Sequence, residues 1–192
     1  MLDMTKPDDV LAGMMTAMAK RDDEVRALGR FQAVCRDADG NELWSDEFDN
    51  LLTTIGKNFL LDQALAGSAY TAAEFMGLIS STSYTGVVAA DTMASHAGWL
   101  ESGVANAPTM SSLRLTCVWS AAAAGVKALT AGLTFTFTGS GTVQGAFIVA
   151  GSGAVNTVAS TAGTLYAGGA LTTPQPVISG NTLTLTYQTT LT

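Results

Sequence analysis

Apolar and polar residues alternate along three stretches in the C-terminal half of the chain, residues 113–119, 133–138 and 183–187. A period of two places every second side chain on the same face of an extended strand. Each stretch is therefore expected to bury one face and to expose the other. Turns rich in glycine and serine separate these stretches, which is typical of an antiparallel β domain.

A β-hairpin is expected near the N-terminus. Residues 31–36 and 42–48 form its two strands, and Asp39-Gly40 supplies the positive φ angles that tight turns need. A calcium-binding loop of the EF-hand type would need glycine at its sixth position and glutamate at its twelfth. Counted from Asp37, Gly40 stands at the fourth position. We therefore interpret these acidic residues as turn-forming residues.

A helix is expected over residues 5–28. Pro7 suits a first helical turn, Asp8 suits the positive end of the helix dipole, and Gly29 suits the position after the last turn. Apolar side chains that recur at helical spacing predict a partner-contact face formed by Leu11, Met14, Met15 and Met18. Such a segment either covers the core of its own domain or clasps a neighbouring subunit, and we favour the clasping arm.

A second helix is expected over residues 50–66, followed by a buried strand over 74–79 and a long loop over 81–98. The chain thus divides into a helical arm, residues 1–28, and a β domain, residues 29–192. The fold class that we predict is mainly β. It is an antiparallel β-sandwich or jelly-roll-like domain of eight or nine strands, with an N-terminal helix and one or two short helices.

Charge is distributed very unevenly along the 192 residues. Seven basic and all sixteen acidic side chains precede Ser102, which gives −9 to residues 1–101, whereas Arg114 and Lys127 give +2 to the remainder. A half with so few charges stays soluble through its hydroxyl groups or is covered by a partner. The net charge of −7 argues against nucleic-acid binding, because that affinity comes from Lys and Arg side chains that neutralise phosphates.

The composition, 47% hydrophobic and 13% charged, is typical of a folded domain. No apolar run reaches the roughly 18 residues that a membrane-spanning helix needs. Acidic residues stand near the N-terminus, where a signal peptide would have basic ones. We therefore expect synthesis in a cytoplasm and no membrane partner.

Few residues suit catalysis. His96 is the single histidine, and a Ser–His–Asp arrangement with Ser95 and Asp91 lacks the G-x-S-x-G motif that often accompanies it, so we expect a loop histidine bonded to backbone. Cys35 and Cys117 are expected to be buried free thiols in strands, with a disulfide between them or a reactive thiol as alternatives.

Paired carboxylates for sugar hydrolysis would have to come from the first half of the chain, where Asp46 and Glu47 are the nearest candidates. Together with Asp49, both fit better as the solvated end of the hairpin. We predict that the protein is not an enzyme and that it has no catalytic residue, no cofactor and no metal site.

Several stretches from Gly29 onward together carry a resemblance to a known protein family. They are residues 34–37 and 49–62, residues 66–72 and 76–78, and residues 90–99 (ADTMASHAGW), with shorter pieces at 145–148, 163–166 and 179–183. On these stretches the chain resembles a family of small virion structural proteins of tailed bacteriophages, encoded near the head genes. Residues 1–28 lie outside the resemblance.

The resemblance implies a place in the virion, and its motifs name no catalytic residue. We expect a capsid decoration or cement protein on the capsid exterior, which clamps subunits of the major capsid protein and forms a homo-oligomer, a trimer or dimer. The alternative is a tail or fibre component that binds a host receptor or glycan, for which exposure of Trp99, Trp119 or Tyr166 would be evidence. His96 and Trp99 are interpreted as a capped turn and an aromatic anchor.

Overall fold

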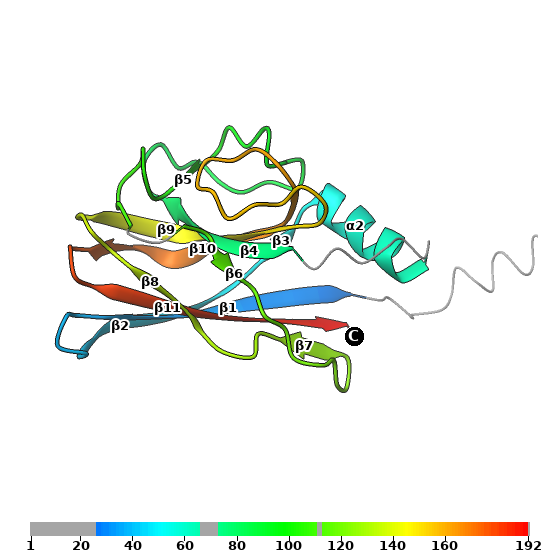
Figure 1. Ribbon diagram of the computed structural model, residues 1–192, viewed down its shortest axis with the longest axis horizontal. Helices are drawn as coiled ribbons and strands as arrows, with labels where there is room; N and C mark the ends of the chain where they lie inside the picture. Colours follow the sequence, from blue (N-terminus) through cyan, green and yellow to red (C-terminus); the bar gives the residue numbers. More distant parts are fainter. Residues whose placement is uncertain (1–25, 66–72, 111–112, 192) are drawn as a thin grey trace, which may run out of the picture.

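The chain folds as an antiparallel β-sandwich, and the computed structural model describes residues 26–65, 73–110 and 113–191 (Figure 1). The strands are β1 (Ala27–Arg36), β2 (Glu42–Asp49), β3 (Leu51–Leu52), β4 (Glu74–Ser80), β5 (Leu100–Glu101), β6 (Leu115–Thr116), β7 (Val126–Ala128), β8 (Leu133–Thr136), β9 (Gly141–Ala150), β10 (Thr164–Val177) and β11 (Thr182–Leu191). One helix, α2 (Thr54–Leu65), belongs to the described residues. The predicted mainly β class is confirmed.

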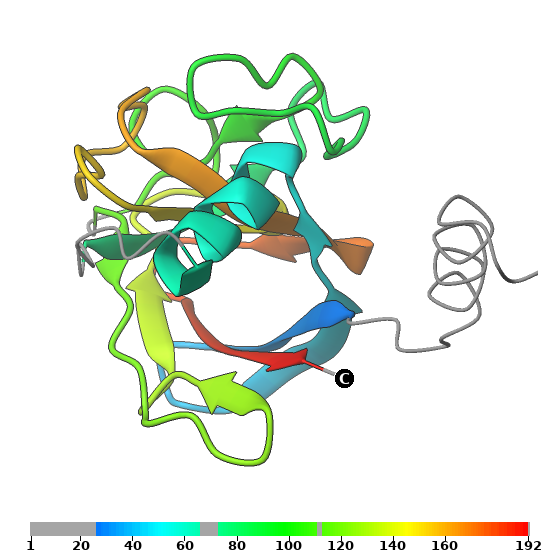
Figure 2. The ribbon, with the colours of Figure 1, turned by 90° about the vertical axis from the view of Figure 1, so that its right-hand side faces the viewer.

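The strands form two sheets. Sheet A has the order β2-β1-β11-β7, and β8 also pairs with β11. Sheet B has the order β3-β10-β9-β4-β5, and β6 also pairs with β4. Helix α2 lies at one end of the two sheets, in front in Figure 2.

The predicted hairpin is confirmed as strands β1 and β2, in which Phe31 lies opposite Phe48. Its turn is held by Asp37, whose Oδ1 accepts hydrogen bonds from the backbone N–H groups of Asp39 at 2.9 Å and Asn41 at 2.8 Å. Gly40 has a φ of 89°, the left-handed conformation that glycine adopts without strain. The acidic residues of this segment therefore serve turn geometry, as the sequence predicts.

Strand β11 runs along the whole of β1, with Ala27 opposite Leu191 at one end and Arg36 opposite Thr182 at the other. The C-terminal end of β11 accordingly lies beside the start of β1 in Figure 2. The second edge of β11 is shared, because β8 pairs with residues 182–185 and β7 with residues 188–190.

Alternate residues of the two sheets fill the space between them. The main contributors are Phe31, Ala33, Cys35, Leu183, Leu185 and Tyr187 from sheet A and Met76, Leu78, Ala146 and Ile148 from sheet B. The ring of Phe31 packs against those of Phe48 and Tyr187, with centroid distances of 5.0 Å and 4.6 Å. The alternation predicted for residues 183–187 is confirmed, since Thr186 points outward and is exposed.

Sheet B is buried on its second face as well. There Ile79, Phe147, Val149 and Leu165 pack against Met93, Trp99 and Ala154 from the loops. Residues 143–150 of β9 are consequently buried without interruption, as in strands that are covered on both faces. The covering segments, residues 81–99, 102–106 and 151–163, are called the loop layer below and lie above sheet B in Figure 1.

Helix α2 begins later than the predicted residue 50, because residues 51–52 pair with β10 as strand β3. Thr53 caps the helix: its Oγ1 accepts a hydrogen bond from the backbone N–H of Gly56 at 3.0 Å. The same hydroxyl donates to the backbone oxygen of Leu165, which fixes the helix to β10.

The N-terminal boundary of the β domain also differs from the predicted one. Strand β1 begins at Ala27, so the last positions of the helix expected over residues 5–28 belong to the strand, and the β domain begins before Gly29. The physical reason is the ladder with β11, which pairs Ala27 with Leu191 and Leu28 with Thr190. The first 25 residues, with the rest of that helix, lie outside the described residues.

Of the strand predicted over residues 113–119, only β6 is formed, because this stretch pairs with β4 at just two positions, Phe75 and Met76. Such two- and three-residue strands, namely β3, β5, β6 and β7, raise the number of strands above the predicted eight or nine. No helix in the described ranges is long and apolar enough to cross a membrane.

Candidate functional site

The described surface of residues 113–191 is nearly free of charge. Of its two charged side chains, Arg114 is buried, and half-buried Lys127 donates from Nζ to the backbone oxygen of Ser120 at 3.1 Å. By contrast, the hairpin formed by residues 30–49 has six acidic and two basic side chains. The uncharged surface is therefore the unusual one. Two candidate binding regions include parts of it, and the second also includes residues 81–99 and 102–106.

The first region is the outer face of sheet A. A row of hydroxyl and carboxamide side chains, which we call the threonine face, consists of Thr134, Thr136, Thr182, Thr184, Thr186, Gln188 and Thr190. The hydroxyl oxygens of Thr134 and Thr184 lie 2.9 Å apart across the strands. The hydroxyl of Thr186 donates to Oε1 of Gln32 on β1 at 3.2 Å. A hydroxyl group both donates and accepts, so these side chains keep hydrogen-bonding capacity toward a partner.

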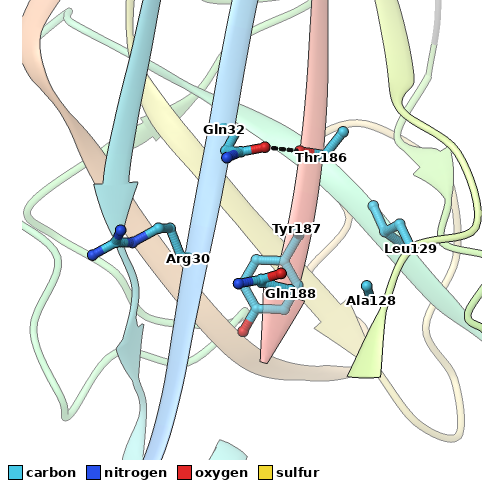
Figure 3. Close-up of a pocket in the computed structure, with 7 residues that line it drawn as sticks. All are labelled: Arg30, Gln32, Ala128, Leu129, Thr186, Tyr187 and Gln188. Carbon is cyan, nitrogen blue, oxygen red and sulfur yellow. Dashed lines mark hydrogen bonds between the residues drawn. The ribbon is translucent and has the colours of Figure 1, made fainter. Parts of the chain in front are cut away.

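A shallow pocket of about 80 Å³ lies in this face, where β11 changes its partner from β8 to β7 (Figure 3). It is lined by Arg30, Gln32, Ala128, Leu129, Thr186, Tyr187 and Gln188. Arg30 extends from β1 toward β2, away from Ala128, and pairs with Asp49 at 3.1 Å. Pockets that enclose small molecules measure roughly 300–1,000 Å³, so this depression fits a side chain of a partner rather than a whole ligand.

The second region is the loop layer, which is built around Trp99. The indole is fully buried, donates from Nε1 to Oδ2 of Asp91 at 3.0 Å, and stacks on His96 with a centroid distance of 3.9 Å. Nδ1 of His96 lies 3.0 Å from the backbone oxygen of Trp99, and Oδ2 of Asp91 also accepts from the backbone N–H of Val88. The interpretation of His96 as a loop histidine bonded to backbone, and of Trp99 as an anchor, is confirmed. Asp91 contacts the indole rather than the imidazole.

Beneath the same loops lies a buried ion pair. Arg114 donates from Nε to Oε1 and from Nη2 to Oε2 of Glu101, both at 2.8 Å. Nη2 also donates to the backbone oxygen of Ser160, and the backbone N–H of Ala159 donates to Oε2 of Glu101, again at 2.8 Å. The guanidinium carbon lies 5.4 Å from the centroid of the Phe147 ring. The pair thus fixes residues 151–163 over sheet B.

The pocket beside this ion pair measures about 140 Å³, again below the size of ordinary ligand sites. The alternating pattern of residues 113–119 predicts Arg114 only as one more polar position of a strand. The available signal was that it is the single arginine in the second half of the chain, where no acidic residue follows Ser102.

The other predicted site residues have structural partners. Asp46 accepts from the backbone N–H and the hydroxyl of Thr172 at 2.7 and 2.8 Å, which joins β2 to β10. Glu47 accepts from Nε2 of Gln32 at 2.7 Å and faces Arg30. The predicted partner-contact face, Leu11, Met14, Met15 and Met18, lies outside the described residues.

The aromatic and thiol predictions have different outcomes. Trp99 and Tyr166 are buried, and Trp119 is partly buried and donates from Nε1 to Glu74, so the exposed aromatic platform that would favour glycan binding is not formed by them. Cys35 and Cys117 are buried free thiols, as predicted, although Cys117 lies just beyond β6. In the described part of the chain, no group of three or more His, Cys, Asp or Glu side chains is arranged to hold a metal ion.

Comparison with known proteins gives no family and no function for the chain. No protein-family model, curated protein or solved structure matches the chain at a significant level. What the molecule offers is therefore its own geometry: two candidate contact surfaces on a β-sandwich, the threonine face, rich in hydroxyl groups, and the loop layer, fixed from beneath.

Proposed function

We propose that the protein is a structural component of a tailed-phage particle, a decoration or cement protein that binds the capsid exterior. In this role it contacts adjacent subunits of the major capsid protein and acts as a homo-oligomer, a trimer or dimer. It is made in the cytoplasm of the bacterial host and then binds the assembled shell. The proposal rests on the family resemblance together with one structural observation, the nearly uncharged surface of residues 113–191.

The uncharged surface supports the proposal through the cost of desolvation. Removing a charged side chain from water costs several kcal/mol unless a partner charge replaces the solvent, whereas a hydroxyl group costs little once the partner hydrogen-bonds to it, and burial of an apolar group is favourable. The loop layer, which joins residues 151–163 of this surface to residues 81–99 and 102–106, exposes Val88, Val104 and Val155, with 54%, 79% and 39% of their surface accessible. A surface of this kind suits a permanent contact with another protein.

The rigidity of the loop layer also supports the proposal. Trp99 and the Glu101–Arg114 pair fix the loops before any partner arrives, so little conformational entropy is lost on binding. Many modest contacts that exist only on the assembled lattice then stabilise the lattice by mass action.

The decisive experiment is the number of copies per purified virion, measured by quantitative mass spectrometry against the major capsid protein. A decoration protein is expected in hundreds of copies, and particles that lack it should fail earlier under heat and osmotic shock. A handful of copies per particle would instead favour the alternative, a tail or fibre component. Shells that are equally robust without the protein would remove the cement role.

The contact surface is tested with two matched variants. Val104→Asp places a charge on the loop layer, and Leu43→Asp places the same charge on the acidic hairpin, where Leu43 is 50% exposed. Binding to shells that lack the protein should weaken at least tenfold for Val104→Asp and change little for Leu43→Asp. Equal binding by both variants would exclude the loop layer as the contact.

A further inference from the structure

We propose that the threonine face is a self-association surface, through which two copies of the chain pack sheet A against sheet A as a twofold-symmetric dimer. The inference goes beyond the proposed function and does not depend on a place in a virus particle. It follows from which faces are covered, from the chemistry of the face, from its area and from the distribution of charge.

The outer face of sheet A is the sheet face that the described residues leave uncovered. The inner faces of both sheets pack on each other, and the outer face of sheet B lies under the loop layer. The edge at β7 is covered as well, because the backbone N–H of Ser120 bonds to the oxygen of Ala128 and Trp119 bridges to Leu129.

The edge at β2 is disfavoured for pairing with a second copy. It carries Glu42, Asp46, Glu47 and Asp49, and the same edge on another molecule would place like charges against one another. Association of two copies by strand addition is therefore opposed by charge, which leaves packing face to face.

The chemistry of the threonine face is complementary to itself. A twofold interface brings a surface against its own copy, so each group must be able to bind groups of the same kind. Threonine hydroxyls and the carboxamides of Gln32 and Gln188 both donate and accept hydrogen bonds. The exposed side chains of Thr186 and Gln188 lie at the rim of the shallow pocket in Figure 3, which gives a neighbouring side chain a place to insert.

The area of the face also fits a dimer. Strands β1 and β11 have ten residues each, which makes the whole outer face of sheet A about 33 Å long, and its four columns of strands, two of which carry the threonine face, make it about 19 Å wide. Two such faces bury on the order of 1,300 Å², within the roughly 1,200–2,000 Å² of stable interfaces. Sheets that stack in this way lie about 10 Å apart.

Charge also selects the symmetry axis. An axis across the strands would place each β2 over the β2 of the other copy and bring Glu47 and Asp49 near their own equivalents. An axis parallel to β11 places β2 over β8 and β7 of the other copy, whose outward side chains, among them Thr134, Val126 and Ala128, are uncharged. The structure therefore assigns an axis parallel to β11, with Arg30 and Asp49 of each copy level with Gln188 and Ala128 of the other.

The test is the solution mass of the full chain by sedimentation equilibrium, compared with that of two variants. Thr186→Lys places a like charge on both halves of the proposed interface, and Thr157→Lys makes the same change at an exposed position of the loop layer. We expect a dimer for the parent chain and for Thr157→Lys, and a dissociation constant at least tenfold higher for Thr186→Lys. Gln188→Lys repeats the test at a second exposed position, and circular dichroism verifies that each variant is folded.

Three results would overturn the inference. One is a monomeric parent chain at high concentration. Another is a dimer that both Thr186→Lys and Gln188→Lys leave unchanged. The third is a trimer, because three copies cannot pair the same face two by two. A chain that lacks residues 1–25 and dimerises when the full chain does not would show that this segment, rather than a second copy, covers the face.

Discussion

Glu101 and Arg114 are joined by two parallel hydrogen bonds of 2.8 Å, and both side chains are almost completely buried beneath the loop layer. Removing one partner leaves the other charge buried without compensation, which costs roughly 3–5 kcal/mol. Arg114→Met should therefore lower the free energy of unfolding by about that amount. Urea titration followed by tryptophan fluorescence measures it, with Trp99 as a reporter inside the same loops.

The matched control is Arg36→Met, which removes an exposed pair with Glu42 at 3.7 Å. Exposed pairs contribute about 0–1 kcal/mol, so this variant should stay near the parent. The double variant Glu101→Leu/Arg114→Met should recover part of the loss, because no unpaired charge remains. Equal stability of Arg114→Met and Arg36→Met would show that the buried pair does not stabilise the loop layer.

Glu74 makes the stability depend on pH. Burial raises the pKa of this carboxyl, opposed by the hydrogen bond from Trp119 and by the charge of Lys127. The folded state therefore holds the proton more tightly than the unfolded state, and stability is lost as the pH rises from the ordinary value through the raised pKa. Glu74→Gln keeps an oxygen for Trp119 but does not titrate, so its stability relative to the parent should increase between about pH 4 and pH 7. A relative decrease over that range would contradict the assignment.

At position 56, in helix α2, glycine is expected to be more stabilising than alanine, contrary to the usual helix propensities. Alanine is a better helix former than glycine by about 1 kcal/mol, but a Cβ at this position would lie 2.1 Å from the backbone oxygen of Tyr166. Gly56→Ala should therefore destabilise the protein by about 1–3 kcal/mol, as overpacking does. Thermal unfolding measures the effect, and Lys57→Ala, at an exposed position of the same helix, is the control that should remain near the parent.

The two thiols should be unreactive in the folded protein. Burial raises the pKa of Cys35 to about 11, and burial together with the charge of Glu74 raises the pKa of Cys117. Since the thiolate is the nucleophile, a disulfide reagent at neutral pH should modify neither residue until the chain unfolds. Rapid modification of one thiol in the native state would show that its segment opens.

Local patterns in the sequence predict sheet A well. The alternation of residues 183–187 gives both the buried positions and the outward threonines, and the Asp39-Gly40 turn fixes the hairpin. These features depend on residues close in the sequence and on a sheet with one face in water, for which period-two patterning applies directly.

Sheet B is much less predictable, because its outer face is covered by loops that have no periodic pattern. The burial of Phe147 and Val149 depends on Trp99 and Ala154 in two separate loops. Arg114 is predicted as an outward side chain, yet it is buried because Glu101 and the backbone of Ser160 lie around it. These contacts between residues far apart in the sequence also determine that the outer face of sheet B is covered, whereas that of sheet A remains exposed.

The position of Ala27 opposite Leu191 has a mechanical consequence. A tension applied through the segments that lead into β1 and out of β11 acts at one end of sheet A, between its two central strands, and pulls them apart sideways. The interstrand hydrogen bonds then bear the load one pair after another, as in a zipper, instead of sharing it as they would under shear. A tether attached to these two segments should therefore open sheet A at low force.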